Sequence, residues 1–134
     1  MLAKDRLEGM SSSTTSGASS AYAAELTFAL TLADRADAIS LSRYQALDLE
    51  ITTKPDNTPV TDADKSVEAA IIEAITAQYP NDGIVGEEFG NDAGGAQRYW
   101  VIDPIDGTRA FIAGETHFAH SLAVARNGHV TAAA

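Results

Sequence analysis

Hydrophobic residues recur at intervals of three and four positions in two long segments, and this spacing predicts two amphipathic helices. The first helix is predicted over about residues 22–44. Its predicted buried stripe consists of Leu26, Leu30, Ala33, Ala36 and Ile39. Glu25, Asp34 and Arg35 fall off this stripe, so the pattern places them on the polar side of the helix.

The second helix is predicted over residues 62–78. Its apolar stripe consists of Val67, Ala70, Ile71, Ala74 and Ile75. Thr61 is a suitable N-cap, and Asp64 follows three residues later, as in a capping box. The turn-forming residues 79–83 end this helix.

Shorter apolar runs between turn residues predict strands. Residues 47–52 alternate between apolar and polar, which indicates a half-buried strand, whereas the unbroken apolar run at 99–102 indicates burial on both faces. The other strands are predicted at residues 84–86, at 121–125 and from 130 onward. Asn127 and Gly128 between the last two strands favour a hairpin turn.

Two segments between these elements have the composition of loops. Residues 53–59 (TKPDNTP) contain two prolines and an Asp-Asn pair, and residues 91–97 are rich in Gly, Asp and Ala. Residues 1–20 contain a Ser/Thr/Gly tract and are predicted to be a disordered extension, within which Met10 is an alternative start. The chain stops within a predicted strand at Ala134, which suggests a fragment of a longer protein.

The composition is that of one soluble domain with a hydrophobic core. The chain has 134 residues, of which 45% are hydrophobic and 21% charged. It contains no cysteine, which excludes disulfides and fits a cytoplasmic location. No apolar run approaches the roughly 18 residues of a membrane span. The net charge of −10 argues against nucleic acid and anionic membranes as partners, and an anionic substrate would need a cation as mediator.

Carboxylates follow two of the predicted strands directly. Glu87 and Glu88 come after Ile-Val-Gly, and Asp103 and Asp106 come after Tyr-Trp-Val-Ile. Carboxylates at adjacent strand ends can converge, and Mg²⁺ takes one or two of them together with waters and phosphate oxygens. Pro104 is expected to force a turn that aims both aspartates into one pocket.

Backbone groups around these aspartates add to the predicted site. The Ile105 carbonyl offers a further oxygen ligand for the metal. Gly107 and Thr108 are predicted to open a short helix or turn whose exposed backbone N–H groups suit a phosphate oxygen. The sequence therefore predicts a site for a metal and a phosphate group at the end of a rigid strand.

Three segments of the chain resemble the inositol monophosphatase superfamily of Mg²⁺-dependent, lithium-sensitive phosphatases. They are KPDNTPVTDAD at 54–64, GEE at 86–88 and WVIDPIDGTRAF at 100–111, and the likeness covers about residues 22–130. The resemblance implies an α+β fold of layered helices on a mixed or antiparallel sheet, of the inositol monophosphatase/fructose-1,6-bisphosphatase type. Residues 21–134 would form the N-terminal, metal-binding half of that domain.

The resemblance also implies the metal ligands. Glu87 and Asp103 would bind one Mg²⁺, and Asp103, the Ile105 carbonyl and Asp106 would bind a second. An intact family member would hold two or three Mg²⁺ ions. Paired metals activate the attacking water and stabilise the leaving oxygen in phosphoryl transfer.

The implied catalytic residues are Asp64, Thr108 and Glu87. Asp64 and Thr108 would orient and deprotonate the attacking water, while Glu87 acts through the metal that it binds. The backbone amides of Gly107 and Thr108 would bind the phosphate group.

The implied activity is the hydrolysis of a small phosphate monoester. Residues 32–68 and the segment GEEFG look like bacterial histidinol-phosphatases of this superfamily, so histidinol phosphate is the best substrate guess. Residues 109–134 are equally like phosphatases that act on inositol phosphates or on nucleotide 3'-phosphates. The partner is therefore a small phosphorylated metabolite, and family members are commonly homodimers.

The chain departs from the family in length and in one motif. Members are about twice as long and carry a later Trp-Asp motif whose aspartate completes the second metal site. The only tryptophan here is Trp100, which Val101 follows, and Glu115 is the only acid after Asp106. A non-catalytic remnant that keeps the first half of the fold is therefore the alternative to an enzyme.

The remaining polar residues near these motifs have simpler interpretations. Glu88 is expected to lie behind the ligands or to face solvent, and Lys54 is either a surface lysine or a residue near the active-site loop. His117 and His120 are interpreted as loop or strand-edge residues, because no third nitrogen or sulfur ligand lies nearby. Arg109 is expected to be structural or exposed.

Overall fold

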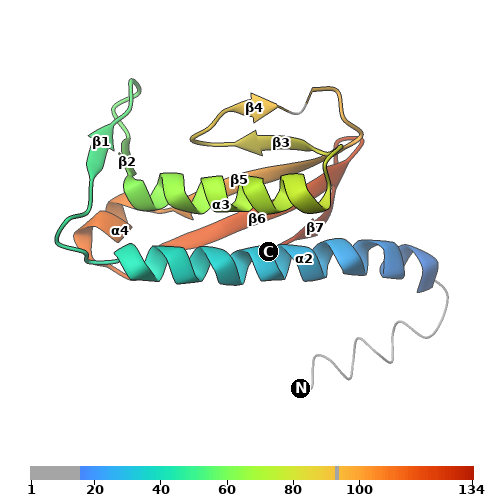
Figure 1. Cartoon of the computed structure of the whole chain (residues 1–134), viewed down its shortest axis with the longest axis horizontal. Coiled ribbons are helices and arrows are strands. Elements are labelled where there is room, and N and C mark those ends of the chain that lie inside the picture. Colours follow the sequence, from blue (N-terminus) through green and yellow to red (C-terminus); the bar gives the residue numbers. More distant parts are fainter. Residues whose placement is uncertain (1–15, 93) are drawn as a thin grey trace, which may run out of the picture.

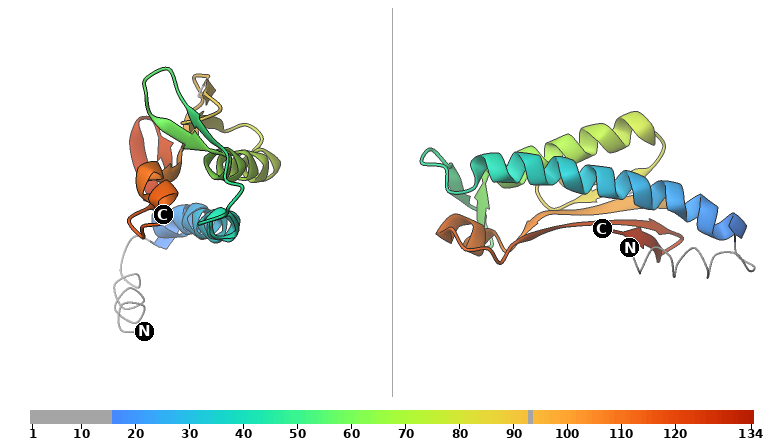
Figure 2. Two further views of the ribbon diagram at one scale, coloured as in Figure 1. Left: turned by 90° about the vertical axis from the view of Figure 1, so that its left-hand side faces the viewer. Right: turned by 90° about the horizontal axis from the view of Figure 1, so that it is seen from below.

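Two long helices lie side by side on one face of a five-stranded sheet in the computed structural model of the chain, which describes residues 16–92 and 94–134 (Figure 1). They are α2 (Ser16–Arg43) and α3 (Asp62–Gln78), and Figure 2 shows both on the same side of the strands. This arrangement confirms the α+β architecture of helices layered on a mixed sheet. No helix within the described residues is both long enough and apolar enough to span a membrane.

The sheet has the strand order β4-β3-β5-β6-β7. Its strands are β3 (Gly83–Gly86), β4 (Asn91–Asp92), β5 (Arg98–Asp106), β6 (Ala119–Arg126) and β7 (His129–Ala133). The pair β3–β5 is parallel and the other pairs are antiparallel. Asn127 and Gly128 have φ values of 52° and 82° between β6 and β7, so the predicted hairpin turn is confirmed.

Helix α3 begins at the predicted capping box. The Thr61 hydroxyl accepts a hydrogen bond from the Asp64 backbone N–H at 3.2 Å, and the Asp64 carboxylate accepts one from the Thr61 backbone N–H at 2.7 Å. Val67, Ile71 and Ile75 point from this helix into the core, as their spacing predicts. The box therefore fixes both the start of the helix and the position of Asp64.

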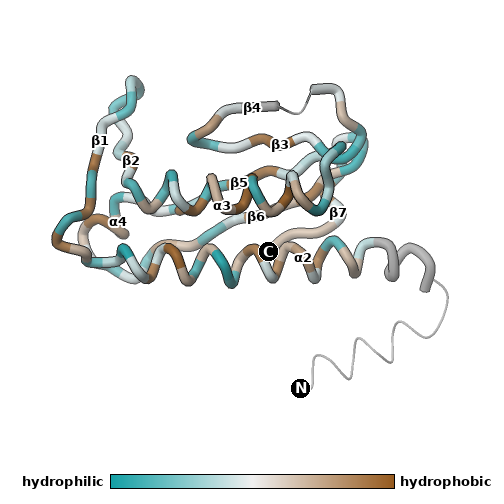
Figure 3. Tube along the Cα trace, in the orientation of Figure 1, coloured by the Kyte–Doolittle hydropathy of each residue, from teal (hydrophilic) through white to brown (hydrophobic). Residues whose placement is uncertain are grey.

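The predicted buried stripe of α2 is wrong at its first two positions. Leu26 and Leu30 are 40% and 53% exposed, whereas Ala29 and Leu32 are buried and face the sheet. Hydrophobic residues recur along the coloured part of the helix, so hydropathy alone does not select the buried side (Figure 3). Small side chains select it instead, because Ala29 and Ala36 let the helix approach the strands closely.

A buried acid stabilises this choice of helix face. Glu25, which the pattern places on the polar side, is only 2% exposed. Its carboxylate accepts hydrogen bonds from Arg98 at 3.1 Å, Arg126 at 2.8 Å and Thr131 at 3.1 Å. Although burial alone would raise the pKa of Glu25, these partners lower it below its ordinary value. A charge is tolerated in the core here because strands β5, β6 and β7 each supply it with a donor.

The helix also starts earlier than the sequence predicts. α2 begins at Ser16, so residues 16–20 of the predicted disordered extension are helical. Residues 1–15 lie outside the described part of the chain.

Strand β5 is buried on one face only. Trp100 and Ile102 point toward the helices and pack with Leu122 and Val124 of β6. Val101 points to the opposite face and is 40% exposed, so the predicted burial on both faces is wrong. Among residues 16–92 and 94–134, both long helices lie on the first face and none lies on the second (Figure 2).

Two local predictions also need correction. Residues 47–50 of the strand predicted at 47–52 are turn or irregular, and Leu47 is fully exposed. β1 (Ile51–Thr53) starts later and pairs antiparallel with β2 (Pro59–Thr61), so the predicted turn residues form the tip of a hairpin. The predicted loop at 91–97 contains the short strand β4.

A small second cluster anchors the short helix α4 (Thr108–Ala113) at the same end of the molecule as this hairpin (Figure 1). Ala63, Ile105 and Phe111 are buried there, and Tyr44 and Phe118 pack against them. The cluster holds the start of α4 close to the start of α3.

Truncation of two neighbouring leucines tests which face of α2 is buried. Leu32→Ala should lower the free energy of unfolding by about 2–5 kcal/mol, because it leaves a cavity against the sheet. Leu30→Ala should change it by less than about 0.5 kcal/mol. Urea denaturation of both variants measures this, and equal losses would contradict the observed helix orientation.

Candidate active site

The end of the sheet at which β3 and β5 stop forms a cleft of about 330 Å³. The β1–β2 hairpin and the start of α4 supply its other walls. The lining residues are Lys54, Asp56, Thr58, Pro59, Glu87, Glu88, Asp103, Ile105, Asp106, Gly107, Thr108 and Arg109. Every residue that the sequence proposes for the site therefore lines the cleft, except Asp64, which lies behind Thr108 and contacts it.

A bulge in β5 places Asp103 and Asp106 in the same cleft. Asp103 pairs with Ser121 and Asp106 pairs with Ala119, so two residues of β5, Pro104 and Ile105, lie opposite one residue of β6. Residues three apart point to opposite faces of a regular strand, and one extra residue restores them to the same side. The predicted turn at Pro104 is wrong, because β5 continues through it to Asp106. A bulge accepts proline, since the missing N–H leaves no strand partner unsatisfied.

Glu87 and Asp103 face each other across the end of the parallel pair β3–β5. A hydrogen bond to Asp103, burial and repulsion from the Asp103 charge raise the pKa of Glu87 to about 7. One Asp103 oxygen, Oδ1, is buried without a hydrogen-bond partner in the described part of the chain. Two carboxyl groups this close together, beside an oxygen that lacks a donor, fit the binding of a divalent cation.

The cleft supplies only part of a cation's coordination. Within the described residues, no three acidic or histidine side chains come close enough to enclose one ion. Mg²⁺ commonly keeps several waters and takes one or two carboxylates plus phosphate oxygens. Glu87, Asp103, Asp106 and the Ile105 carbonyl are the groups in this cleft that could hold such an ion.

Asp64 and Thr108 form a hydrogen-bonded pair at the wall of the cleft. The Thr108 hydroxyl lies 3.0 Å from Asp64 Oδ1 and 3.2 Å from the Ile105 carbonyl, and both of these oxygens are acceptors. Asp64 is 1% exposed, and its other oxygen accepts from the Thr61 hydroxyl at 2.6 Å. When Thr108 donates to Asp64, its lone pairs become available to a water molecule in the cleft. The pair can therefore orient a water and take up its proton.

Gly107 makes the entry to α4 possible. It has φ of 90°, and a Cβ atom there would lie 2.5 Å from the His117 carbonyl oxygen. Both the left-handed backbone and the close approach exclude a side chain. The chain can thus reverse directly after Asp106 and place Thr108 against Asp64.

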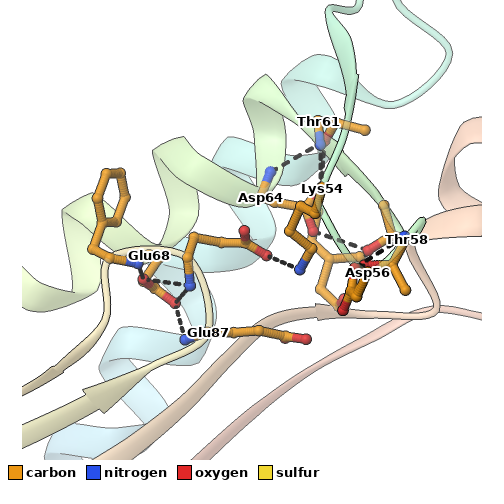
Figure 4. A network of polar contacts seen from close by, with 11 residues as sticks. Lys54, Asp56, Thr58, Thr61, Asp64, Glu68 and Glu87 are labelled. Atoms are coloured by element: carbon orange, nitrogen blue, oxygen red, sulfur yellow. Dashed lines mark hydrogen bonds and ion pairs between the residues drawn. The ribbon is translucent and has the colours of Figure 1, made fainter.

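Glu68 is a site residue that the sequence analysis missed. It lies on α3 one turn after Asp64, and its side chain is fully buried. Its carboxylate accepts from the backbone N–H groups of Glu87 at 2.7 Å, Glu88 at 3.0 Å and Phe89 at 2.5 Å (Figure 4). A Cβ atom at Gly86 would lie 2.7 Å from Glu68 Oε2. Glu68 falls within the apolar stripe of α3, and an acid at such a position is the sequence signal that could have shown its structural role.

Lys54 and Glu88 form an ion pair at the mouth of the cleft. Lys54 Nζ lies 3.3 Å from Glu88 Oε1, and the Glu88 side chain is only 6% exposed (Figure 4). The solvent-facing alternative for Glu88 is therefore wrong, and Lys54 belongs to the site. Burial alone would lower the pKa of Lys54, but the charges of Glu88, Glu87 and Asp56 raise it above its ordinary value.

The other polar residues singled out in the sequence have different surroundings. Arg109 lines the cleft and lies 3.4 Å from the Asn57 carbonyl oxygen. His117 is exposed in the loop after α4. His120 is a strand residue of β6 and not a loop residue, and its ring contacts the Pro104 carbonyl of β5 and Asp37 of α2.

The sequence profile described as "Inositol monophosphatase family" matches residues 22–134. The chain belongs to this family. It is 47% identical over 104 residues to a histidinol-phosphatase of Mycobacterium tuberculosis, a match that covers 78% of this chain and 40% of the relative. It is 40% identical over 110 residues to the Nus factor SuhB of Escherichia coli, covering 81% of this chain and 41% of the relative. The resemblance noted in the sequence is confirmed.

Solved structures of family members share this fold. An IMPase of Thermotoga maritima matches with a TM-score of 0.73 at 30% identity, over 79% of this chain and 41% of that one. An inositol monophosphatase of Zymomonas mobilis matches with a TM-score of 0.65 at 40% identity, over 82% and 42%. The chain spans about two fifths of the length of the relatives that it matches.

Replacement of Glu68 tests its hold on the loop that carries Glu87. Glu68→Ala should lower the free energy of unfolding by on the order of 3 kcal/mol, because three part-buried backbone N–H groups lose their acceptor. Glu73→Ala removes an exposed glutamate from the same helix and should have little effect. Chemical denaturation measures both, and equal effects would contradict the assigned role.

The Glu87–Asp103 pair predicts a pH dependence of stability. The pKa of Glu87 is about 7 in the folded chain, against an ordinary value of 4.5. The folded state therefore holds more protons than the unfolded state between these values, and stability falls as the pH rises through this window.

Without added divalent cations, the melting temperature of Glu87→Gln should fall less between pH 5 and 8 than that of the unsubstituted chain. Glu115→Gln removes an exposed carboxylate and should leave the slope unchanged. A Glu87→Gln curve parallel to that of the unsubstituted chain would show that the two carboxyl groups do not interact.

Proposed function

We propose that this chain carries the N-terminal part of the active site of a Mg²⁺-dependent phosphomonoesterase, with histidinol phosphate as the substrate. The observation that carries the proposal is the contact between Asp64 and Thr108 beside a cleft that holds Glu87, Asp103 and Asp106. A water-orienting pair and a group of carboxylates that needs a cation are the two parts that hydrolysis of a phosphate ester requires.

Each residue has a defined task in this proposal. Glu87, Asp103, Asp106 and the Ile105 carbonyl would hold Mg²⁺, which when bound neutralises phosphate charge and lowers the pKa of a coordinated water. Thr108 orients the attacking water, and Asp64 receives its proton through the Thr108 hydroxyl. The backbone N–H groups of Gly107 and Thr108, two residues that line the cleft, would bind a phosphate oxygen.

The choice of substrate rests on similarity and on the cleft. The relatives named histidinol-phosphatase from Mycobacterium tuberculosis and Streptomyces coelicolor are 47% identical to the chain, whereas the relatives named Nus factor SuhB are 40–42% identical. The cleft is also rich in carboxylates, which suits a substrate that carries an amine besides its phosphate. Inositol 1-phosphate and nucleotide 3'-phosphates are the alternative substrates.

The second candidate is a non-catalytic module. The observation in its favour is the likeness to relatives named Nus factor SuhB, a name that does not state a phosphatase activity. Because the chain covers only about 40% of the histidinol-phosphatases that it matches, their activity stays a proposal for it. A homodimer, a cytoplasmic location and the absence of a nucleic-acid partner stay predictions.

Phosphate release tests the proposed activity. The chain should release phosphate from histidinol phosphate faster than from inositol 1-phosphate, and only with Mg²⁺ present. Asp64→Asn should slow release by about 10²–10⁴-fold, since it removes the proton acceptor. Asp34→Asn, on the exposed side of α2, is the matched control.

A full-length histidinol-phosphatase serves as the positive control. Release that does not depend on Mg²⁺, or an unchanged rate in Asp64→Asn with an intact fold by circular dichroism, would contradict the mechanism. No release by this chain beside an active control would favour the non-catalytic module.

A further inference from the structure

The bulge in β5 places the Pro104 carbonyl at a break in the regular ladder of the sheet. Pro104 and Ile105 lie opposite His120 alone, so the regular ladder between β5 and β6 is interrupted there. A buried carbonyl without a donor is costly, and the strand would tend to return to a regular register. The bulge therefore needs a donor from outside the ladder.

His120 supplies that donor. Its ring Nδ1 lies 2.6 Å from the Pro104 carbonyl oxygen, and its side chain is only 7% exposed. A carbonyl oxygen can only accept, so the geometry requires the proton on Nδ1. The residue that lies opposite the bulge thus also donates a hydrogen bond to it.

The other side of the ring is held by helix α2. Nε2 lies 3.1 Å from the Ser40 hydroxyl and 3.1 Å from Asp37 Oδ1. Ser40 is itself buried, so it restricts the rotation of the imidazole. Contacts at both nitrogens therefore fix the ring between the helix and the strand. Residues that lie behind metal ligands and orient them are commonly held in this way.

We propose that His120 is a positioning residue of the active site. Its hydrogen bond to the Pro104 carbonyl stabilises the bulge, and the bulge turns Asp103 and Asp106 into one cleft. The metal-binding part of this inference rests on the proposed function, whereas the effect of His120 on the bulge does not depend on it.

Two substitutions of His120 test this role: one side chain keeps a hydrogen-bond donor, and the other has none. In His120→Asn the amide nitrogen occupies the same δ position as Nδ1, so the bond to Pro104 can form. His120→Phe keeps a ring of similar size but has no donor. His117→Phe alters an exposed histidine of the neighbouring loop and serves as the control.

Calorimetric titration with Mg²⁺ is the first measurement. His120→Phe should bind Mg²⁺ about 10–100-fold more weakly than the unsubstituted chain, the loss typical of an outer-layer group. His120→Asn should bind almost as well as the unsubstituted chain, and His117→Phe should be unchanged. Ile75→Ala is a destabilised variant of the core cluster and should keep its Mg²⁺ affinity. This result would show that lower stability alone does not weaken binding.

Amide hydrogen exchange of Asp106 and Gly107 is the second measurement and needs no metal. His120→Phe should speed exchange at these two residues relative to β6, and His120→Asn should not. Unchanged exchange in His120→Phe, or an Nε2–H tautomer of His120 by ¹⁵N NMR, would overturn the proposal. If the unsubstituted chain binds no Mg²⁺, the proposed metal site fails, and the exchange data alone decide the role of His120.

Discussion

A regular β-strand sends side chains three residues apart to opposite faces, and the cleft depends on the interruption of this rule between Asp103 and Asp106. One extra residue in β5 brings both carboxylates to the same side. The same irregularity lets the chain reach Gly107, whose left-handed backbone starts α4 and places Thr108 within 3.0 Å of Asp64. The positions of the carboxylates and of the hydroxyl therefore both follow from a single break in the strand ladder.

The acids that the fold buries and the acids that line the cleft differ in what balances their charge. Glu25 and Glu68 each receive several hydrogen bonds from donors that the fold supplies, so their burial is balanced. Glu87 and Asp103 have mainly each other, and the pKa of Glu87 is raised for that reason. Within the described residues, Asp62 Oδ1 and Asp103 Oδ1 are buried carboxylate oxygens without a hydrogen-bond partner, and of the two only Asp103 lines the cleft. This contrast is the physical argument for reading the pair as ligands rather than as core residues.

The sequence predicted the parts of the site that depend on local chemistry. The capping box of Thr61 and Asp64 and the run of residues from Asp103 to Thr108 are readable, because each depends on neighbours within a few positions. The bulge at Pro104 and the role of Glu68 were missed, because each depends on a partner about 15 or more residues away. The buried face of α2 was misjudged for a related reason: Glu25 is neutralised by arginines from β5 and β6, which no helical pattern contains.

The charge balance of the cleft explains how an acidic chain can handle an anionic ligand. The cleft is lined by carboxyl groups of Asp56, Glu87, Glu88, Asp103 and Asp106, against the cations Lys54 and Arg109. Lys54 is already paired with Glu88, so it neutralises a charge of the protein rather than one of a substrate. A phosphate group entering this cleft without a divalent cation would meet a field of its own sign. Under the proposed function, the cleft would therefore bind a cation first and phosphate only through it, and the excess of acids would serve the site.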